Sequence, residues 1–196
     1  GEDGPTHSGN YDIAYLRCIP NMVICTPSDE NETRKLLTTA YLHNGPASVR
    51  YPRGTGPNSN VDKDLKPLKI GEANIINEES SEIVILNFGT LLNEANQISK
   101  ELKATLVDMR FVKPLDEKLL RKLFKKAKVF ISIEDGSIMG GAGSAVQEFA
   151  SKENLNVRSI LFGIPDKFIE HASREEMLVE AGLDVENIKS KLSKLL

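Results

Sequence analysis

The chain has 196 residues, of which 40% are hydrophobic and 27% are charged, and its formal net charge is -3. This composition is typical of a globular protein with one large domain or two modest ones, and the slightly acidic balance argues against nucleic acid or an anionic membrane as a partner. No apolar run approaches the ~20 residues of a membrane span, and the first residues lack the basic and apolar regions of a signal peptide, so we expect a cytoplasmic protein.

The first part of the chain is expected to contain one strand–helix–strand unit. The apolar run NMVICTP predicts a short buried strand at 22–25, and Ser28 follows as the expected N-cap of a helix over 29–44. ASVRYPRG then predicts a second strand at 48–51. This order and spacing indicate a βαβ unit with two parallel strands.

A polar segment over 54–67, rich in Gly, Pro, Asn and Asp, predicts a linker, and we place a domain boundary after Lys66. Residues 1–66 and 67–196 then form two units of an α/β protein. In the second unit strands and helices alternate, which predicts a mainly parallel sheet with helices on both faces. The expected strands are 69–77, 82–90, 104–110, 128–134 and 156–164, and the expected helices are 91–103, 116–127, 140–153, 173–183 and 185–196.

The stretch DGPTHSG near the start places an acid and a histidine in one tight turn. Gly4 and Pro5 favour the turn, which allows the Asp3 carboxylate and the His7 imidazole to face one cavity. Imidazole titrates near neutral pH, so His7 could move a proton or donate to an oxyanion. The alternative is an ordinary loop histidine with a solvated or capping role.

Two arginines, Arg50 and Arg53, follow the second predicted strand in VRYPRG. Ligands of open α/β sheets bind at the carboxyl ends of the strands, and a guanidinium there can hold a phosphate or a carboxylate. The alternative is an arginine paired with an acidic side chain of the protein.

Glycines 140, 141 and 143 lie between a predicted strand and a predicted helix, where a phosphate-binding turn could form. The spacing fits G-x-G-x-x-G poorly because Val146 stands where the third glycine belongs. A tight strand-to-helix turn is the alternative that we favour. His43 and His171 have no potential metal ligands at suitable spacing.

The two cysteines, Cys18 and Cys25, lie in the apolar stretch RCIPNMVICTP. Without a secretion signal, buried free thiols are the expected state, rather than a disulfide or a metal site.

Seven motifs, in this order, resemble one enzyme family. They are DGPTHSG, YLRCIPNMVICTPSDENE, GPASVRYPRG, ILNFGTLL, LVDMRFVKPLD, IMGGAGSAV and GIPDKFI, and they extend from Asp3 to about Leu183. Together they are similar to the carboxyl-terminal third of 1-deoxy-D-xylulose-5-phosphate synthases, which belong to the transketolase-like, thiamine-diphosphate-dependent group. DGPTH is shared with transketolases, whereas VRYPRG and VDMRFVKPLD point to the synthases.

The resemblance implies that residues 1–66 are the carboxyl-terminal part of a pyrimidine-binding domain and residues 67–196 a transketolase C-terminal domain. Enzymes of the family condense pyruvate with D-glyceraldehyde 3-phosphate and release carbon dioxide, and the product feeds isoprenoid, thiamine and pyridoxal biosynthesis. They use thiamine diphosphate and Mg²⁺ and form homodimers. The bacterial cytoplasm or a plastid would be the expected location.

The resemblance also implies roles for individual residues. His7 would face the reacting centre as a catalytic residue, Asp3 would bind substrate, and Arg53 would hold the phosphate of the aldehyde. It assigns no role to Arg50.

The family's diphosphate and magnesium motif, and its catalytic glutamate, would lie before Gly1, which is not a methionine. We therefore expect a piece of a longer enzyme that binds no cofactor or metal alone, is inactive alone and needs the missing amino-terminal part. Two alternatives stay open. The chain could belong to a transketolase or to a relative of the β subunit of a 2-oxo-acid dehydrogenase. It could also be a non-catalytic assembly module.

Overall fold

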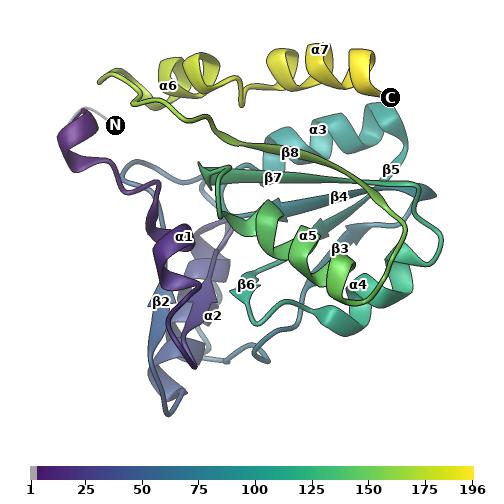
Figure 1. Ribbon diagram of the computed structural model, residues 1–196. Coiled ribbons are helices and arrows are strands. Elements are labelled where there is room, and N and C mark those ends of the chain that lie inside the picture. Colours follow the sequence, from purple (N-terminus) through teal and green to yellow (C-terminus); the bar gives the residue numbers. More distant parts are fainter. Residues whose placement is uncertain (1–3) are drawn as a thin grey trace.

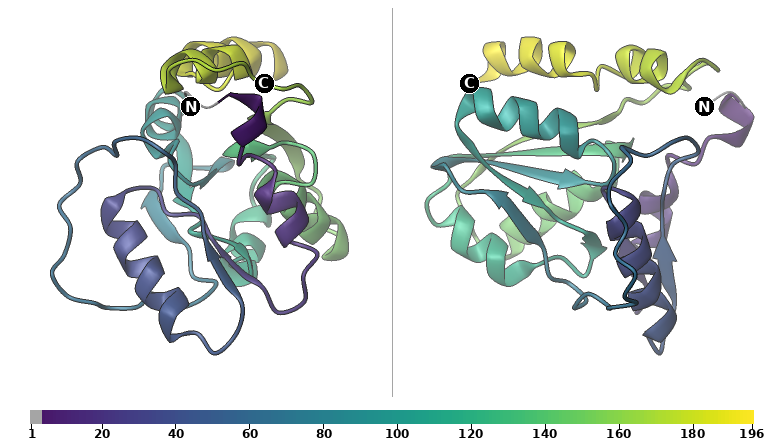
Figure 2. Two further views of the ribbon diagram at one scale, coloured as in Figure 1. Left: turned by 90° about the vertical axis from the view of Figure 1, so that its left-hand side faces the viewer. Right: turned by 180° about the vertical axis from the view of Figure 1, so that it is seen from behind.

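The computed structural model describes residues 4–196, apart from the side chains of Ser80 and Ser81, and contains two β-sheets (Figure 1). The smaller sheet has the strand order β2-β1-β6, and the larger has the order β3-β5-β4-β7-β8. The smaller sheet and its helix α2 lie at one end of the larger sheet (Figure 2).

The smaller sheet contains the predicted βαβ unit. β1 (Val23–Cys25) and β2 (Ala47–Val49) are parallel, and α2 (Glu30–Leu42) connects them, which confirms that prediction. Before β1 the chain forms a short 3₁₀ helix (Pro5–His7) and α1 (Asp12–Leu16), neither of which the sequence pattern indicated.

The predicted N-cap of α2 is wrong by one residue. Asp29 caps the helix, because its carboxylate accepts a hydrogen bond from the Glu32 N–H at 2.8 Å. Ser28 is buried, and its hydroxyl donates instead to the Asp108 carboxylate at 2.6 Å. A hydrogen bond from a hydroxyl to a buried carboxylate stabilises the fold more than a second N-cap would, because the helix already has Asp29 as its cap.

The larger sheet is mainly parallel, as predicted. Only its edge strand β3 runs antiparallel to its neighbour β5. The elements of this unit are β3 (Asn74–Asn77), β4 (Ser80–Phe88), α3 (Leu92–Leu102), β5 (Ala104–Asp108), β6 (Phe111–Lys113), α4 (Glu117–Phe124), β7 (Val129–Ser137), α5 (Ala142–Lys152), β8 (Arg158–Ile164), α6 (Arg174–Ala181) and α7 (Val185–Leu195).

Helices cover both faces of the larger sheet. On one face, α3 and α7 bury Ile98 and Ile188 against the sheet, and on the other, α4 and α5 bury Leu120 and Val146 (Figures 1 and 2). All four side chains are fully buried, so each of these helices turns an apolar face to the sheet.

The third strand of the smaller sheet comes from the second half of the chain. After β5, Arg110 adopts a left-handed conformation (φ 58°), and the chain turns into β6, which pairs antiparallel with β1. The two predicted units therefore share a sheet, although no helix or strand lies between Val49 and Asn74. The boundary after Lys66 stays a prediction.

Both cysteines are free thiols, but only one is buried. Cys25 lies in β1, and burial raises the pKa of its thiol to about 12. The prediction of a buried Cys18 is wrong, because Cys18 lies in the exposed turn after α1, next to Ile19, whose side chain is also exposed. Apolar neighbours in sequence did not indicate burial there, since the turn points away from the core. Within residues 4–196, no helix is both long and apolar enough to cross a membrane.

The Asp108 carboxyl lies at the junction of the two sheets, at the end of β5, and is 1% exposed. Burial raises its pKa to about 7, against the lowering effect of the Ser28 hydrogen bond. Below about pH 7 the folded protein therefore favours the protonated form of Asp108.

We expect the wild type to lose stability relative to the Asp108→Asn variant as the pH rises from about 4 to about 7. The unfolded chain releases the Asp108 proton near the ordinary pKa, whereas the folded protein retains it until about 7, so the unfolded state binds fewer protons in this window. The difference in the free energy of unfolding should change by up to ~1.4 kcal/mol per pH unit. Urea unfolding of both proteins across this range measures it, and parallel pH profiles would contradict a buried, protonated Asp108.

Candidate active site

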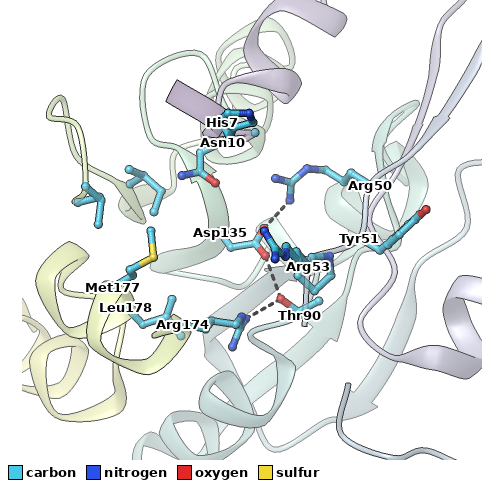
Figure 3. Close-up of a pocket in the computed structure, with 15 residues that line it drawn as sticks. His7, Asn10, Arg50, Tyr51, Arg53, Thr90, Asp135, Arg174, Met177 and Leu178 are labelled. Carbon is cyan, nitrogen blue, oxygen red and sulfur yellow. Dashed lines mark hydrogen bonds and ion pairs between the residues drawn. The ribbon is translucent and has the colours of Figure 1, made fainter. Parts of the chain in front are cut away.

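A pocket of about 280 Å³ lies where the beginning of the chain meets the ends of β2, β4 and β7 and the helix α6 (Figure 3). Its walls are His7, Gly9, Asn10, Arg50, Tyr51, Pro52, Arg53, Gly89, Thr90, Asp135, Ile164, Ile169, Arg174, Met177 and Leu178. The pocket lies at the carboxyl ends of parallel strands, which is where open α/β sheets bind ligands.

The loop that carries His7 is held by the larger sheet. The Ser137 N–H at the end of β7 donates to the Asn10 carbonyl at 2.7 Å, and the Asn10 amide donates to the Ser8 hydroxyl at 3.1 Å. The ring of Tyr11 packs edge-on against Phe168, with 6.4 Å between the ring centroids. The second half of the chain therefore fixes where the first residues lie.

His7 itself is exposed on the pocket wall, at the end of the 3₁₀ turn that follows Gly4 (φ 71°). Its Nδ1 lies 3.0 Å from the Thr6 hydroxyl, within hydrogen-bond distance. A proton transfer to or from a ligand would therefore use the second ring nitrogen, Nε2. The predicted partner Asp3 lies outside the described residues, so its proximity to His7 stays a prediction.

Arg50 is an internal ion-pairing residue. Its Nε donates to the Asp12 carboxylate at 2.8 Å, and its Nη1 is paired with the Asp135 carboxylate. These three side chains are only 14–17% exposed. Burial opposes the charge of Arg50, but the two carboxylates outweigh it, so the pKa of the guanidinium lies above its usual value. For Arg50, the alternative of an arginine paired with acids of the protein is the correct one.

Asp135 joins Arg50 to the turn after β4. Its second oxygen accepts a hydrogen bond from the Thr90 hydroxyl at 2.9 Å. Burial raises the pKa of this carboxyl, but Arg50 and the Thr90 hydrogen bond outweigh that effect and hold the pKa below its usual range. Asp135 is thus a fixed anion that shares the single positive charge of Arg50 with Asp12.

Arg53 also lines the pocket, and its side chain is exposed. A second pocket of about 400 Å³ lies on the other side of the segment Tyr51–Arg53 and reaches the amino end of α2. The two pockets share Arg53, Thr90 and Arg174, so Arg53 stands at the wall between them.

The sequence analysis missed Thr90, Asp135 and Arg174 as pocket residues. Thr90 and Asp135 lie at the carboxyl ends of strands that were predicted, so their position along the chain was a usable signal. For Arg174 there was no local signal, because it lies on α6, and only the packing of that helix brings it to the pocket.

The glycine turn before α5 holds a carboxylate of the protein. The N–H groups of Ala142 and Gly143 each donate to Glu134 at 2.8 Å, and a Cβ at Gly141 would lie 2.4 Å from the same carboxylate. Glu134 is fully buried, and burial raises its pKa to about 7 against the lowering effect of the two N–H groups. The favoured prediction of a tight strand-to-helix turn is confirmed, and the phosphate alternative is wrong, because Glu134 fills the place that a phosphate would need.

The substitution Arg50→Met should destabilise the protein by about 3–5 kcal/mol, because it leaves the largely buried Asp12 and Asp135 carboxylates without a counter-charge. Adding Asp135→Asn should restore part of the loss, since one of those charges is then gone. The matched control is Lys128→Met, which removes a pair with Glu82 whose side chains are 74% and 56% exposed and should cost at most ~1 kcal/mol. Chemical unfolding measures all three, and equal losses for Arg50→Met and Lys128→Met would contradict the role assigned to Arg50.

Two protein-family models match the chain. The model of the pyrimidine binding domain of transketolase matches residues 1–58, and that of the C-terminal domain of transketolase matches residues 71–188. The 1-deoxy-D-xylulose-5-phosphate synthase of Pseudomonas fluorescens (strain Pf0-1) is 52% identical over 190 residues, which are 97% of this chain and 30% of that protein. The protein of the same name from Pseudomonas aeruginosa (strain LESB58) is 53% identical over 189 residues, 96% of this chain and again 30% of the relative. The chain thus spans less than a third of the length of these relatives.

Solved structures agree with these matches. A chain described as a split gene transketolase, inactive beta4 tetramer, has a TM-score of 0.83 at 25% identity, over 97% of this chain and 62% of that one. The transketolase of Campylobacter jejuni subsp. jejuni NCTC 11168 shares the fold, with a TM-score of 0.71 at 20% identity, over 99% of this chain and 29% of that one. The resemblance inferred from the seven motifs is confirmed: the chain belongs to the transketolase family, from whose pyrimidine-binding and C-terminal domains it takes its two parts.

Proposed function

We propose that this chain forms part of the active site of a 1-deoxy-D-xylulose-5-phosphate synthase, which condenses pyruvate with D-glyceraldehyde 3-phosphate and releases carbon dioxide. The observation that carries the proposal is the identity of about half of the residues, along nearly the whole chain, to proteins of that name. A transketolase is the second candidate. It is less well supported, because the transketolases found among the structures are only 20–25% identical.

In this proposal the pocket binds the aldehyde. Arg53 holds the phosphate, because a guanidinium offers a planar pair of N–H donors to phosphate oxygens. His7 is the catalytic residue and exchanges a proton with, or donates a hydrogen bond to, the oxygen of the reacting carbon. Asp3 binds substrate, a role that rests on the resemblance alone. The roles of His7 and Arg53 are supported by their position on the wall of the same pocket.

Arg50, Asp135 and Thr90 have a supporting task. Asp135 is bonded to Arg50 and to Thr90 rather than directed at an open acceptor, and all three residues line the same pocket as His7 and Arg53. Such a bonded set keeps the walls of a pocket in place during turnover, which matters because small displacements of substrate cost much of the rate.

Thiamine diphosphate and Mg²⁺ belong to the proposed full enzyme, but the described residues do not fit the diphosphate end of the cofactor. The glycine turn is filled by Glu134, and residues 4–196 contain no group of three or more His, Cys, Asp or Glu that could hold a metal ion. The diphosphate and metal site of the cofactor would therefore lie in the amino-terminal part of the enzyme.

We further propose that the enzyme is a cytoplasmic homodimer. Apolar side chains on α2 are exposed in this chain, with Leu37 at 48%, Tyr41 at 88% and Leu42 at 62%, which suits a face that packs against further protein. The structural neighbour described as a split gene transketolase is, by the same description, a tetramer. A purely non-catalytic assembly module would not explain the pocket with His7 and Arg53.

The purified chain alone should form no 1-deoxy-D-xylulose 5-phosphate from pyruvate and D-glyceraldehyde 3-phosphate, because the described residues lack a diphosphate and metal site. A fusion in which this chain replaces the matching segment of the Pseudomonas aeruginosa synthase should form it. Product is measured by mass spectrometry. A folded fusion without activity would contradict the proposed function, and two-carbon transfer from a ketose phosphate by that fusion would favour a transketolase.

In that fusion, His7→Ala should lower kcat by about 10²-fold or more, the usual contribution of a positioned acid or base. Arg53→Gln should instead raise the KM for D-glyceraldehyde 3-phosphate by about 10-fold or more and leave the KM for pyruvate unchanged, because a charge-assisted hydrogen bond to the phosphate is lost. Lys69→Gln, which removes an exposed lysine outside the pocket, is the control. Equal effects of Arg53→Gln on both substrates would contradict a phosphate-binding role.

A further inference from the structure

The turn between α2 and β2 contains the pair Asn44-Gly45, and no other asparagine of the sequence precedes a glycine. Both residues are exposed, and neither belongs to a helix or a strand. The turn lies at the amino end of β2, whereas the pocket lies beyond the carboxyl end of that strand. The pair is therefore open to water and separate from the groups that line the pocket.

An Asn-Gly pair can rearrange with loss of ammonia. The main-chain nitrogen of the glycine attacks the side-chain carbon Cγ of the asparagine, so that an N–Cγ bond forms and the Cγ–Nδ2 bond breaks. The amide nitrogen leaves as ammonia together with the proton of the glycine N–H. Water then opens the cyclic imide at one of its carbonyls, which gives an aspartyl or an isoaspartyl residue. Glycine favours this attack because it has no side chain that obstructs its nitrogen and because its backbone adopts many conformations.

The fold leaves the reacting groups of this pair free. Among residues 4–196, none forms a hydrogen bond with the N–H of Gly45 or with the side chain of Asn44. The chain is anchored on either side, because the N–H of His43 is bonded to the last turn of α2 and the Pro46 carbonyl accepts from the Val23 N–H at 3.0 Å. The pair can thus rotate toward the geometry of attack without breaking a hydrogen bond to the described part of the protein.

The imidazole of His43 lies against Gly45. A Cβ built on Gly45 would lie 2.7 Å from His43 Nε2, so the ring fills the space that a side chain would need at this position. The attack requires a base that takes up the proton of the Gly45 N–H, and neutral imidazole accepts a proton near neutral pH. The residue before the pair therefore supplies a base next to the attacking nitrogen.

We propose that Asn44-Gly45 is a self-modification site, at which Asn44 converts to an aspartyl or isoaspartyl residue while His43 accepts the Gly45 proton. Either product places a new negative charge just after the carboxyl end of α2, where the helix dipole disfavours it. The isoaspartyl product also adds a methylene group to the main chain before β2. The modification weakens the connection between α2 and β2 as the protein ages.

The chain contains its own matched comparison at Asn58, which is also exposed, lies outside any helix or strand and precedes the small residue Ser59. There the Glu30 carboxylate accepts from the N–H of Asn58 at 2.8 Å and from the N–H of Ser59 at 3.2 Å. The nitrogen that would attack must first leave a charged partner. Asn58 should therefore convert about 10-fold or more slowly than Asn44.

The experiment is incubation of the purified chain at neutral pH, followed by peptide mapping with mass spectrometry, which detects the replacement of the amide NH₂ by OH. The Asn44 peptide should convert first among the asparagine peptides, and chromatography separates its aspartyl and isoaspartyl forms. His43→Gln should slow this conversion by about 3-fold or more, a modest part of what a positioned base contributes in an active site. The matched control is His171→Gln, which removes another exposed histidine and should leave the rate unchanged.

Conversion of Asn58 as fast as that of Asn44, or an Asn44 peptide that stays intact, would overturn the proposed site. This comparison is made within the wild-type chain and needs no variant to fold. Equal rates in the wild type and in a folded His43→Gln chain would reject the role of His43 as the base, and so would an equal loss in His171→Gln.

Discussion

The position of Arg50 between two carboxylates is the constraint on which the pocket depends. Asp12 comes from α1, Asp135 from β7 of the larger sheet, and Arg50 from the chain just after β2 of the smaller sheet. One guanidinium therefore joins a helix to both sheets. None of these charges is well solvated, and each is stable only while the others are in place. The pocket lies directly against this ion-paired group, and its walls therefore have little freedom to move apart.

The same edge of the larger sheet contains the glycine turn, and there the protein uses its own carboxylate. Glu134 accepts from the first N–H groups of α5, so the helix end is satisfied internally and the end of β7 is held against it. That strand end in turn binds the Asn10 carbonyl and so positions the loop of His7. The glycine turn, whose sequence resembles a phosphate-binding motif, thus helps to position the loop that carries His7.

The two parts of the chain are joined more closely than a linker between them would imply. β6 contributes the third strand to the smaller sheet, and the Ser28 hydroxyl reaches across to the buried Asp108. A shared sheet and a buried polar contact make separate movement of the two parts costly. His7 and Arg53, which come from the first part, therefore depend on the second part for their positions.

The sequence by itself determined the alternation of strands and helices, the parallel βαβ unit and the residue types available for chemistry, because periodicity and capping are local properties of the chain. It also showed His7 and Arg53 as candidates. Only the tertiary structure decided that Arg50 is neutralised inside the protein, that Cys18 is exposed, and that Arg174 reaches the pocket more than 160 residues after His7. Ion pairing, burial and convergence on a cavity depend on partners distant in sequence, which no local pattern records.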